Sequence, residues 1–480
     1  MSSYTVQKIA KNTGVLITGD VIFRFISLFV TIYLARYLGT ADFGKYGFIF
    51  AFIAFSGVVT DSGLRTILVR GMSREPLRSP KLIGNGYFIK AFLTILAVAL
   101  STLTITLMDY PTDITHYVYI ASLTLVFFSF SDLYEGIFQA NLSMVYSVIA
   151  KLSFKLISAA LIFWIIFSHG TLVQILWALV VAEAIKTFIN YYYSRRFVKP
   201  KLEIDIGLCK HLLKESLPIA LSSVTLVIYF NTDVVMLSII QGDSAVGIYY
   251  AAHKLVEPLN FIPYALVLSL FPIMSEFFKS SREKLTTMYQ LGFKYILVIM
   301  LPLVVCVAVL SDEIIFMLYG GQFTASVQVL GILIWVLMFS SLSMLIGNFL
   351  ISIEKQTLHM YSMLIGTLVN VVFNFLLIPV FSYTGAAIVT LATNIVIFAV
   401  NMYFVSNSVG YMNVRPKVLK PLVCGLVMGI TMISFKYFDI TVFLSLPFGI
   451  IMYFAGLHIL EVFTGVDIQL FKKIIAVSRR

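Results

Sequence analysis

Charged side chains are scarce in this sequence. Asp, Glu, Lys and Arg together make up 12% of the 480 residues, whereas hydrophobic residues make up 60%. A soluble domain carries about 25% charged residues, because its surface faces water. Mean hydropathy is +0.96, which is far above what a water-exposed surface allows. These values exclude a water-soluble globular protein and favour a membrane protein.

Cysteine and histidine are also rare. The three cysteines, Cys209, Cys306 and Cys424, form no C-x-x-C pair, and the six histidines show no metal-ligand spacing. No G-x-x-x-x-G-K-[ST] or G-x-S-x-G motif occurs. We therefore expect no disulfide framework, no metal, no cofactor and no enzymatic activity.

Apolar runs of membrane-spanning length recur along the whole chain. About 20 helical residues cross a hydrocarbon core of roughly 30 Å. The runs lack the strict alternation of a β-barrel, so we expect an all-α polytopic membrane protein whose first run is a retained helix. About fourteen spans are predicted, at residues 9–35, 45–69, 83–108, 116–139, 146–168, 171–193, 214–240, 244–275, 286–310, 325–350, 357–380, 383–407, 418–437 and 440–463.

Basic residues gather in alternate connections between these spans. The basic connections carry clusters such as Arg70 to Lys81, Arg195 to Lys214 and Lys279 to Lys284, and the opposite connections almost lack Lys and Arg. The positive-inside rule then places both termini in the cytoplasm of a multi-pass cell-membrane protein. It also explains the net charge of +11 without a nucleic-acid partner. No connection is long enough for a catalytic domain.

An internal repeat divides the chain. Two stretches share a Gly, a second Gly five residues later and a Tyr two residues after that; they are Gly39, Gly44 and Tyr46, and Gly242, Gly247 and Tyr249. Six helices per repeat give two units of the same orientation, which is typical of transporters that bind substrate between halves. We predict an N-terminal lobe at 1–200, a C-terminal lobe at 201–410, and two additional helices with a cytoplasmic tail at 411–480.

Ionisable residues lie inside the predicted spans, where each costs roughly 2.5 to 3.5 kcal/mol. Asp20 and Arg24 are four residues apart in the first span, and Asp61 and Arg65 repeat this spacing in the second. One interpretation is a self-neutralising pair within each helix. The other is a central cavity in which Arg24 and Arg65 bind a phosphate or pyrophosphate while the two acids orient them.

The second half carries its own polar cluster. Lys254 is a candidate for a second cationic wall, and Asp233 or Glu257 is a candidate site for H⁺ or Na⁺ coupling; a cluster wetted from a nearby loop is the alternative. Asp132 and Glu135, with Lys151 and Lys155, are better explained as a structural ion network between helices.

Several motifs in order resemble the polysaccharide flippases of the multidrug/oligosaccharidyl-lipid/polysaccharide exporter superfamily. They run from Leu34 to Tyr46, from Asp61 to Leu64, from Asn231 to Lys254, from Leu318 to Gly320, and from Asn370 to Ala387. The resemblance implies a V-shaped bundle whose two lobes alternate between the two sides of the membrane.

The resemblance also implies a function. Such proteins carry an oligosaccharide on a polyprenyl or dolichyl (di)phosphate from the cytoplasmic to the outer leaflet, for surface polysaccharide or glycan biosynthesis. The partners expected are this lipid-linked oligosaccharide, membrane lipids, H⁺ or Na⁺, and glycan-assembly enzymes. The alternatives are a cation-coupled multidrug exporter of the same superfamily and a membrane glycan polymerase or ligase.

Overall fold

The structure is a computed structural model that describes residues 3–410, 414–438 and 440–463. Every regular element within these residues is a helix, as the apolar runs predict. The predicted cytoplasmic tail lies outside the described residues from 464 onward.

The chain forms two compact units. The first comprises Met1–Lys254 and Asn374–Tyr383, and the second comprises Leu255–Phe373 and Thr384–Arg480. The first unit therefore extends past the predicted lobe boundary at residue 200.

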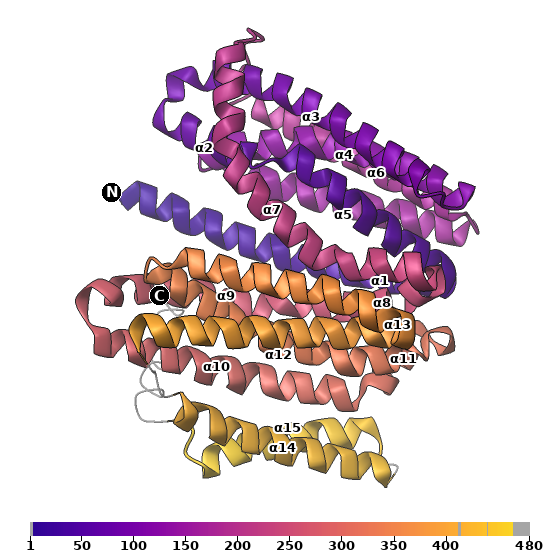
Figure 1. Cartoon of the computed structure of the whole chain (residues 1–480), viewed down its shortest axis with the longest axis vertical. Helices are drawn as coiled ribbons and strands as arrows, with labels where there is room; N and C mark the ends of the chain where they lie inside the picture. Colours follow the sequence, from indigo (N-terminus) through magenta and orange to yellow (C-terminus); the bar gives the residue numbers. More distant parts are fainter. Residues whose placement is uncertain (1–2, 411–413, 439, 464–480) are drawn as a thin grey trace. The chain divides into compact units, whose positions relative to one another are not determined.

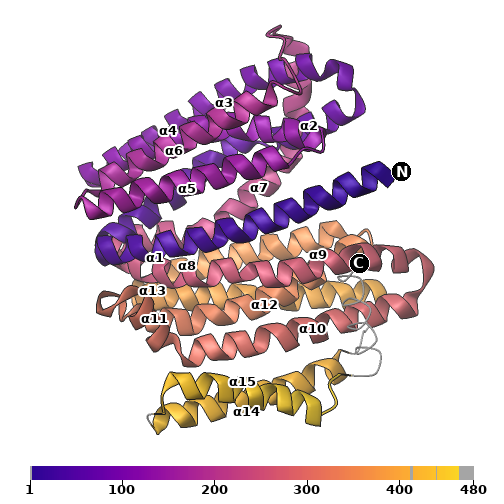
Figure 2. The same ribbon diagram turned by 180° about the vertical axis from the view of Figure 1, so that it is seen from behind.

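In the first unit, long helices run side by side, and α3, α4 and α6 do so in both views (Figures 1 and 2). Large apolar side chains such as Trp164 and Phe167 point outward and are exposed, as expected of a surface that faces lipid. The helices are α1 (Ser3–Asp61), α2 (Leu64–Arg74), η1 (Pro76–Arg78), α3 (Ser79–Leu107), α4 (Thr112–Ala140), α5 (Val145–Phe167), α6 (Leu172–Ser194), α7 (Ile206–Gln241) and α8 (Asp243–Val256).

The second unit is built from long helices joined by short turns. In its interior the Tyr289 ring packs edge-on against Phe293 and at a tilt against Phe349, and Lys294 is almost fully buried. The helices are η2 (Glu257–Asn260), α9 (Phe261–Ser280), α10 (Arg282–Val309), α11 (Ser311–Tyr319), η3 (Gly321–Phe323), α12 (Ser326–Ser352), α13 (Gln356–Val409), α14 (Arg415–Tyr437) and α15 (Val442–Ile459). The segment Asn374–Tyr383 of α13 belongs to the first unit.

The described residues contain twelve helical stretches that are long and apolar enough to cross a membrane, whereas the sequence predicted about fourteen spans. Two of the twelve, Thr18–Arg74 and Gln356–Val409, are 57 and 54 residues long. Each contains a residue with non-helical backbone angles, Gly39 in the first and Ser382 in the second. These breaks fall between spans that the sequence predicted separately.

The two glycine motifs of the repeat adopt the same local structure. Gly39 has φ 71° and ψ −178°, and Gly242 has φ 80° and ψ −178°. Glycine adopts positive φ without the steric cost that a side chain imposes. Each glycine therefore ends one helix sharply and lets the next one start at once.

The motifs also pack against each other within the first unit. A Cβ atom on Gly44 would lie 1.8 Å from the carbonyl oxygen of Asp243, and one on Gly247 would lie 1.9 Å from the carbonyl oxygen of Thr40. Residues 40 and 44 thus meet residues 243 and 247 reciprocally. The glycines are required because backbone occupies the space of a side chain.

The predicted second span, 45–69, is not one continuous helix. Ser62 and Gly63 have φ of 43° and 66°, and they separate α1 from α2. Asp61 ends the first helix and Arg65 belongs to the second, so their four-residue spacing does not place them one turn apart on a continuous helix.

The connection between α6 and α7 is docked on α3. The side-chain amide of Asn85 donates to the carbonyl of Glu203 at 3.0 Å, and its side-chain oxygen accepts from the backbone N–H of Asp205 at 2.8 Å. The Lys81 ammonium lies 2.7 Å from the Asp205 carboxylate. This connection is therefore held in place, and α7 begins at Ile206 rather than near residue 214, where the predicted span begins.

Candidate functional site

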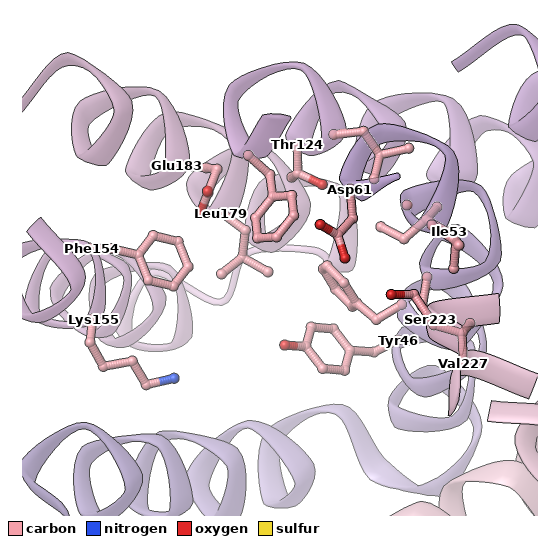
Figure 3. Close-up of a pocket in the computed structure, with 16 residues that line it drawn as sticks. Tyr46, Ile53, Asp61, Thr124, Phe154, Lys155, Leu179, Glu183, Ser223 and Val227 are labelled. Carbon is pink, nitrogen blue, oxygen red and sulfur yellow. The ribbon is translucent and has the colours of Figure 1, made fainter. Parts of the chain in front are cut away.

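A cavity of about 490 Å³ lies among the helices of the first unit (Figure 3). Five helices supply its walls: α1, α4, α5, α6 and α7. The lining residues are Tyr46, Phe50, Ile53, Ala54, Gly57, Val58, Asp61, Thr124, Leu125, Phe128, Phe154, Lys155, Leu179, Glu183, Ser223 and Val227. The wall is therefore mostly apolar and aromatic, with a few polar groups, as is usual for a ligand site.

Polar groups converge on this cavity from opposite sides. The Asp61 carboxyl and the Tyr46 hydroxyl point into it, and the Lys155 ammonium enters from α5 across from them (Figure 3). Lys155 contacts the Phe23 ring, with its nitrogen 5.3 Å from the ring centroid. Among the described residues, no carboxylate forms an ion pair with Lys155.

Glu183 has its charge balanced locally. Its carboxylate forms an ion pair with Lys186, one turn further along α6, and both side chains are buried. The Lys186 nitrogen also lies 5.5 Å from the Phe128 ring centroid and 5.4 Å from that of Phe154. Asp61 and Lys155 are thus the two charges through which this cavity can contact a ligand.

Arg65 belongs to an ion network beside the cavity. Its guanidinium lies 3.1 Å from Asp132, 3.4 Å from Glu135 and 3.3 Å from the side-chain oxygen of Gln139. Lys151 also belongs to this network, because its ammonium lies 3.2 Å from the Glu135 carboxylate. The predicted structural network is therefore present for Asp132, Glu135 and Lys151, and it includes Arg65, whereas Lys155 faces the cavity.

Lys90 completes this network from α3. Its side chain is fully buried, and its ammonium donates to the Thr60 carbonyl at 2.7 Å and to Asp132 at 2.9 Å. Thr60 lies in the last turn of α1, where carbonyls lose their helical partners and the helix dipole favours a cation. Lys90 thus caps the helix that the break at Ser62 and Gly63 ends.

Asp20 and Arg24 form the pair that their spacing predicts, at 2.8 Å. Both are partly exposed, with relative side-chain exposures of 47% and 37%, and neither lines the cavity. The structure does not bring Arg24 and Arg65 into one cavity wall of the first unit.

The remaining predicted site residues are divided between the units. Asp233 is buried in the first unit and accepts a hydrogen bond from the Tyr249 hydroxyl at 2.7 Å. Lys254 lies 4.9 Å from the Tyr250 ring centroid. Glu257 is the first residue of η2 and belongs to the second unit. The three residues are therefore not treated as one cluster.

Sequence reasoning missed the buried lysines Lys90, Lys186 and Lys294 and the cavity role of Lys155. The sequence could have indicated Lys90, Lys186 and Lys294, because each lies within a predicted apolar span. A charge inside a membrane span indicates a partner or a cavity. In the described residues, no group of three or more His, Cys, Asp or Glu side chains is placed to hold a metal ion.

Comparison with known proteins identifies the family. Residues 9–278 match the family described as Polysaccharide biosynthesis protein. The chain belongs to this family. Residues 218–376 also match the MatE family. The chain is therefore a multi-pass membrane protein of a transporter superfamily, and it is not an enzyme.

Two curated relatives of this polysaccharide biosynthesis family member are archaeal. The uncharacterized membrane protein MJ1068 of Methanocaldococcus jannaschii is 25% identical over 341 residues, which cover 70% of this chain and 67% of the relative. The probable low-salt glycan biosynthesis flippase Agl15 of Haloferax volcanii is 24% identical over 231 residues. This second match spans 47% of the chain and about half, 49%, of the relative.

Solved structures show the fold of this family member. The lipid II flippase MurJ in an inward closed conformation aligns with a TM-score of 0.78 at 15% identity, covering 92% of this chain and 98% of that chain. An inward-facing multidrug resistance MATE family transporter aligns with a TM-score of 0.66 at 15% identity, covering 81% and 98%. At these identities the likeness concerns the fold alone.

Proposed function

We propose that this protein is a flippase that moves a polyprenyl- or dolichyl-(di)phosphate-linked oligosaccharide from the cytoplasmic to the outer leaflet by alternating access. The match of more than half of the chain to a polysaccharide biosynthesis family carries the proposal. The similarity to a probable glycan biosynthesis flippase supports the same cargo.

The cavity of the first unit has the chemistry of a sugar-phosphate site. The rings of Tyr46, Phe50, Phe128 and Phe154 in its wall offer flat apolar faces to a sugar ring. Lys155 supplies a cation for a phosphate, and Asp61 supplies an acceptor for sugar hydroxyls. The sugar and phosphate need such a path because hydrocarbon excludes them, whereas the prenyl tail can remain in lipid.

The candidate residues that do not line this cavity have other roles in the proposal. Three groups contact the two terminal nitrogens of Arg65, so we assign Arg65 to positioning α2 against α4. Arg24 and Lys254 are additional cationic candidates along the substrate path, and Asp20 pairs with Arg24. Asp233 and Glu257 remain the candidate groups for coupling to H⁺ or Na⁺.

We further propose fourteen membrane crossings with both termini in the cytoplasm. Each of the two longest helical stretches is broken by a residue with non-helical angles, and two crossings in each raise twelve stretches to fourteen. Basic residues at alternate connections support this orientation. The lobes at 1–200 and 201–410 are then the two moving halves, with 411–480 as an addition.

A cation-coupled multidrug exporter is the second candidate. Residues 218–376 match the MatE family, and MATE transporters share the fold. That function needs an acidic cavity for organic cations. The Lys155 ammonium in the cavity wall favours an anionic cargo instead.

Translocation in proteoliposomes tests the proposal. Purified protein should flip a fluorescent polyprenyl-diphosphate oligosaccharide, and Lys155→Gln should slow flipping about tenfold or more, since a hydrogen bond to a charged group contributes about 1.5–3 kcal/mol. Lys151→Gln is the matched control, because Lys151 lies one turn earlier on α5 and pairs with Glu135.

Two outcomes would overturn the assignment. Wild-type protein that accumulates an organic cation but does not flip the lipid-linked sugar would favour the exporter. Equal flipping rates for Lys155→Gln and wild type would remove the cavity from the substrate path.

A further inference from the structure

A second cavity, of about 230 Å³, lies at one end of the second unit. Its wall is formed by the α9–α10 turn, the α12–α13 turn and the end of α13. Two basic residues, Arg282 and Lys355, line it together with the hydroxyl-bearing Ser408 and the apolar side chains Phe278, Leu285 and Ile353. No acidic side chain of the described residues is in the lining.

The arginine of this cavity is held in position. The Arg282 guanidinium donates to the Val409 carbonyl at the end of α13. A guanidinium has five N–H donors in a rigid fork, so this single contact fixes the group and leaves donors for a ligand. Among the described residues, no carboxylate forms an ion pair with Arg282.

The lysine is presented by a tight turn after α12. Glu354 adopts a positive φ of 63°, and the next backbone N–H, of Lys355, bonds to the Leu350 carbonyl at 2.8 Å. The turn directs Lys355 into the lining and leaves Glu354 out of it. Within the described part of the chain, Lys355 has no carboxylate partner.

Two helix starts add to the positive potential. Arg282 is the first residue of α10, and Lys355 directly precedes α13. The N-terminal ends of long helices carry partial positive charge and unpaired N–H groups. The C-terminal ends of α9, α12 and α13 also reach this wall and carry partial negative charge. The full charges of Arg282 and Lys355 outweigh these partial charges, and no acid of the described residues lines the wall, so the cavity favours an anion.

The volume of this cavity limits which anions can fit. Sites for drug-sized ligands measure about 300–1,000 Å³, and 230 Å³ is below this range. An oligosaccharide does not fit, whereas one phosphate group with a small substituent does. The apolar side chains Phe278, Leu285 and Ile353 in the lining disfavour a second charged group on the ligand.

From this arrangement we propose that the Arg282–Lys355 cavity binds a phosphate ester, either the headgroup phosphate of an anionic phospholipid or a small soluble phosphate. Binding would tie the α9–α10 turn to the α12–α13 turn and the end of α13, and so stabilise this end of the unit. The site is separate from the transport cavity and does not depend on the transported cargo.

Thermal unfolding of the full-length protein in neutral detergent tests the site. Phosphatidylglycerol, glycerol phosphate and inorganic phosphate are added separately, with diacylglycerol as the reference that lacks a phosphate. We expect at least one phosphate probe to raise Tm by several degrees in wild type. The double variant Arg282→Gln with Lys355→Gln should lose this increase.

The control and a second variant keep the result interpretable. Lys284→Gln removes a nearby cation that does not line the cavity, and it should retain the full increase. Ser408→Glu adds a carboxylate to the wall and should abolish the increase without removing either cation.

The pattern of probes identifies the source of the phosphate. A response to phosphatidylglycerol alone assigns a lipid headgroup, and a response to the soluble probes assigns a free phosphate ester. No Tm increase in wild type with any probe, or an equal increase in the double variant, would overturn the proposal.

Discussion

The ammonium of Lys90 lies 2.9 Å from the carboxylate of Asp132, and the lysine side chain is fully buried. The second carboxylate oxygen of Asp132 accepts from Arg65 at 3.1 Å. One acid thus serves two cations from α2 and α3. This relationship explains how a lysine is accommodated in the interior of a membrane-spanning segment.

Asp132→Asn should strongly destabilise the protein. The change leaves Lys90 buried without its countercharge, and removing one partner of a buried ion pair costs about 3–5 kcal/mol. This loss of stability should appear as a lower Tm, measured by circular dichroism in detergent.

The double variant Lys90→Met with Asp132→Asn should be more stable than Asp132→Asn alone, because the uncompensated charge is gone. A double variant that is less stable than either single variant would contradict the ion-pair explanation.

Gly44→Ala and Gly247→Ala should each destabilise the first unit. Each added methyl meets a backbone carbonyl at less than 2 Å, of Asp243 and Thr40 respectively, and backbone cannot move aside as a side chain can. We expect a loss of about 1–3 kcal/mol or more, measured as a lower Tm.

Gly331→Ala is the control for this pair. Its added Cβ would meet only the Ser311 hydroxyl at 3.8 Å, and alanine favours a helix over glycine by about 1 kcal/mol. A control that loses as much stability as Gly44→Ala would indicate a general effect of replacing glycine.

Arg24→Gln should leave stability almost unchanged. Arg24 and Asp20 are both partly exposed, and such pairs contribute about 0–1 kcal/mol. If Arg24 contacts the substrate, flipping in proteoliposomes should fall while Tm stays constant. An unchanged flipping rate would show that Arg24 does not contact the substrate and serves only as the ion-pair partner of Asp20.

The Lys81–Asp205 contact should make stability depend on pH under acidic conditions. The pKa of Asp205 is lowered because Lys81 and the Leu208 N–H donate to its carboxylate. The stabilisation is therefore present above the unfolded pKa of about 3.9 and is lost as pH falls through the lower folded pKa.

Asp205→Asn keeps an N-cap acceptor but removes this charge. Its Tm should be lower than that of wild type above pH 5, and the difference should shrink in more acidic buffer. A difference that is constant down to pH 3 would rule out this linkage.

Hydropathy was enough to predict the all-helical membrane class, because crossing hydrocarbon imposes length and composition on each segment. The number of spans was less certain, since the described residues contain twelve spanning stretches and about fourteen spans were predicted. The break at Ser62 and Gly63 was not predicted, since a Ser-Gly pair inside an apolar run is also compatible with a continuous helix. That one break separated Asp61 from Arg65 and changed the roles of both.

The partners of the site residues were harder to predict than the residues themselves. Lys151 and Lys155 are one turn apart on α5, yet one pairs with Glu135 and the other lines the cavity. Which neighbour a side chain meets depends on helix rotation and on residues far away in sequence. The partner of Lys90 was equally hard to predict from the sequence, because Asp132 lies on another helix.

The buried Lys90 also has a consequence for biosynthesis. Its carboxylate partner is 42 residues further along the chain, which corresponds to roughly 2–8 seconds of synthesis. An unpaired lysine in the hydrocarbon core costs roughly 2.5–3.5 kcal/mol. Insertion of α3 is therefore expected to be complete only when α4 arrives, so that the two helices enter the bilayer as a hairpin.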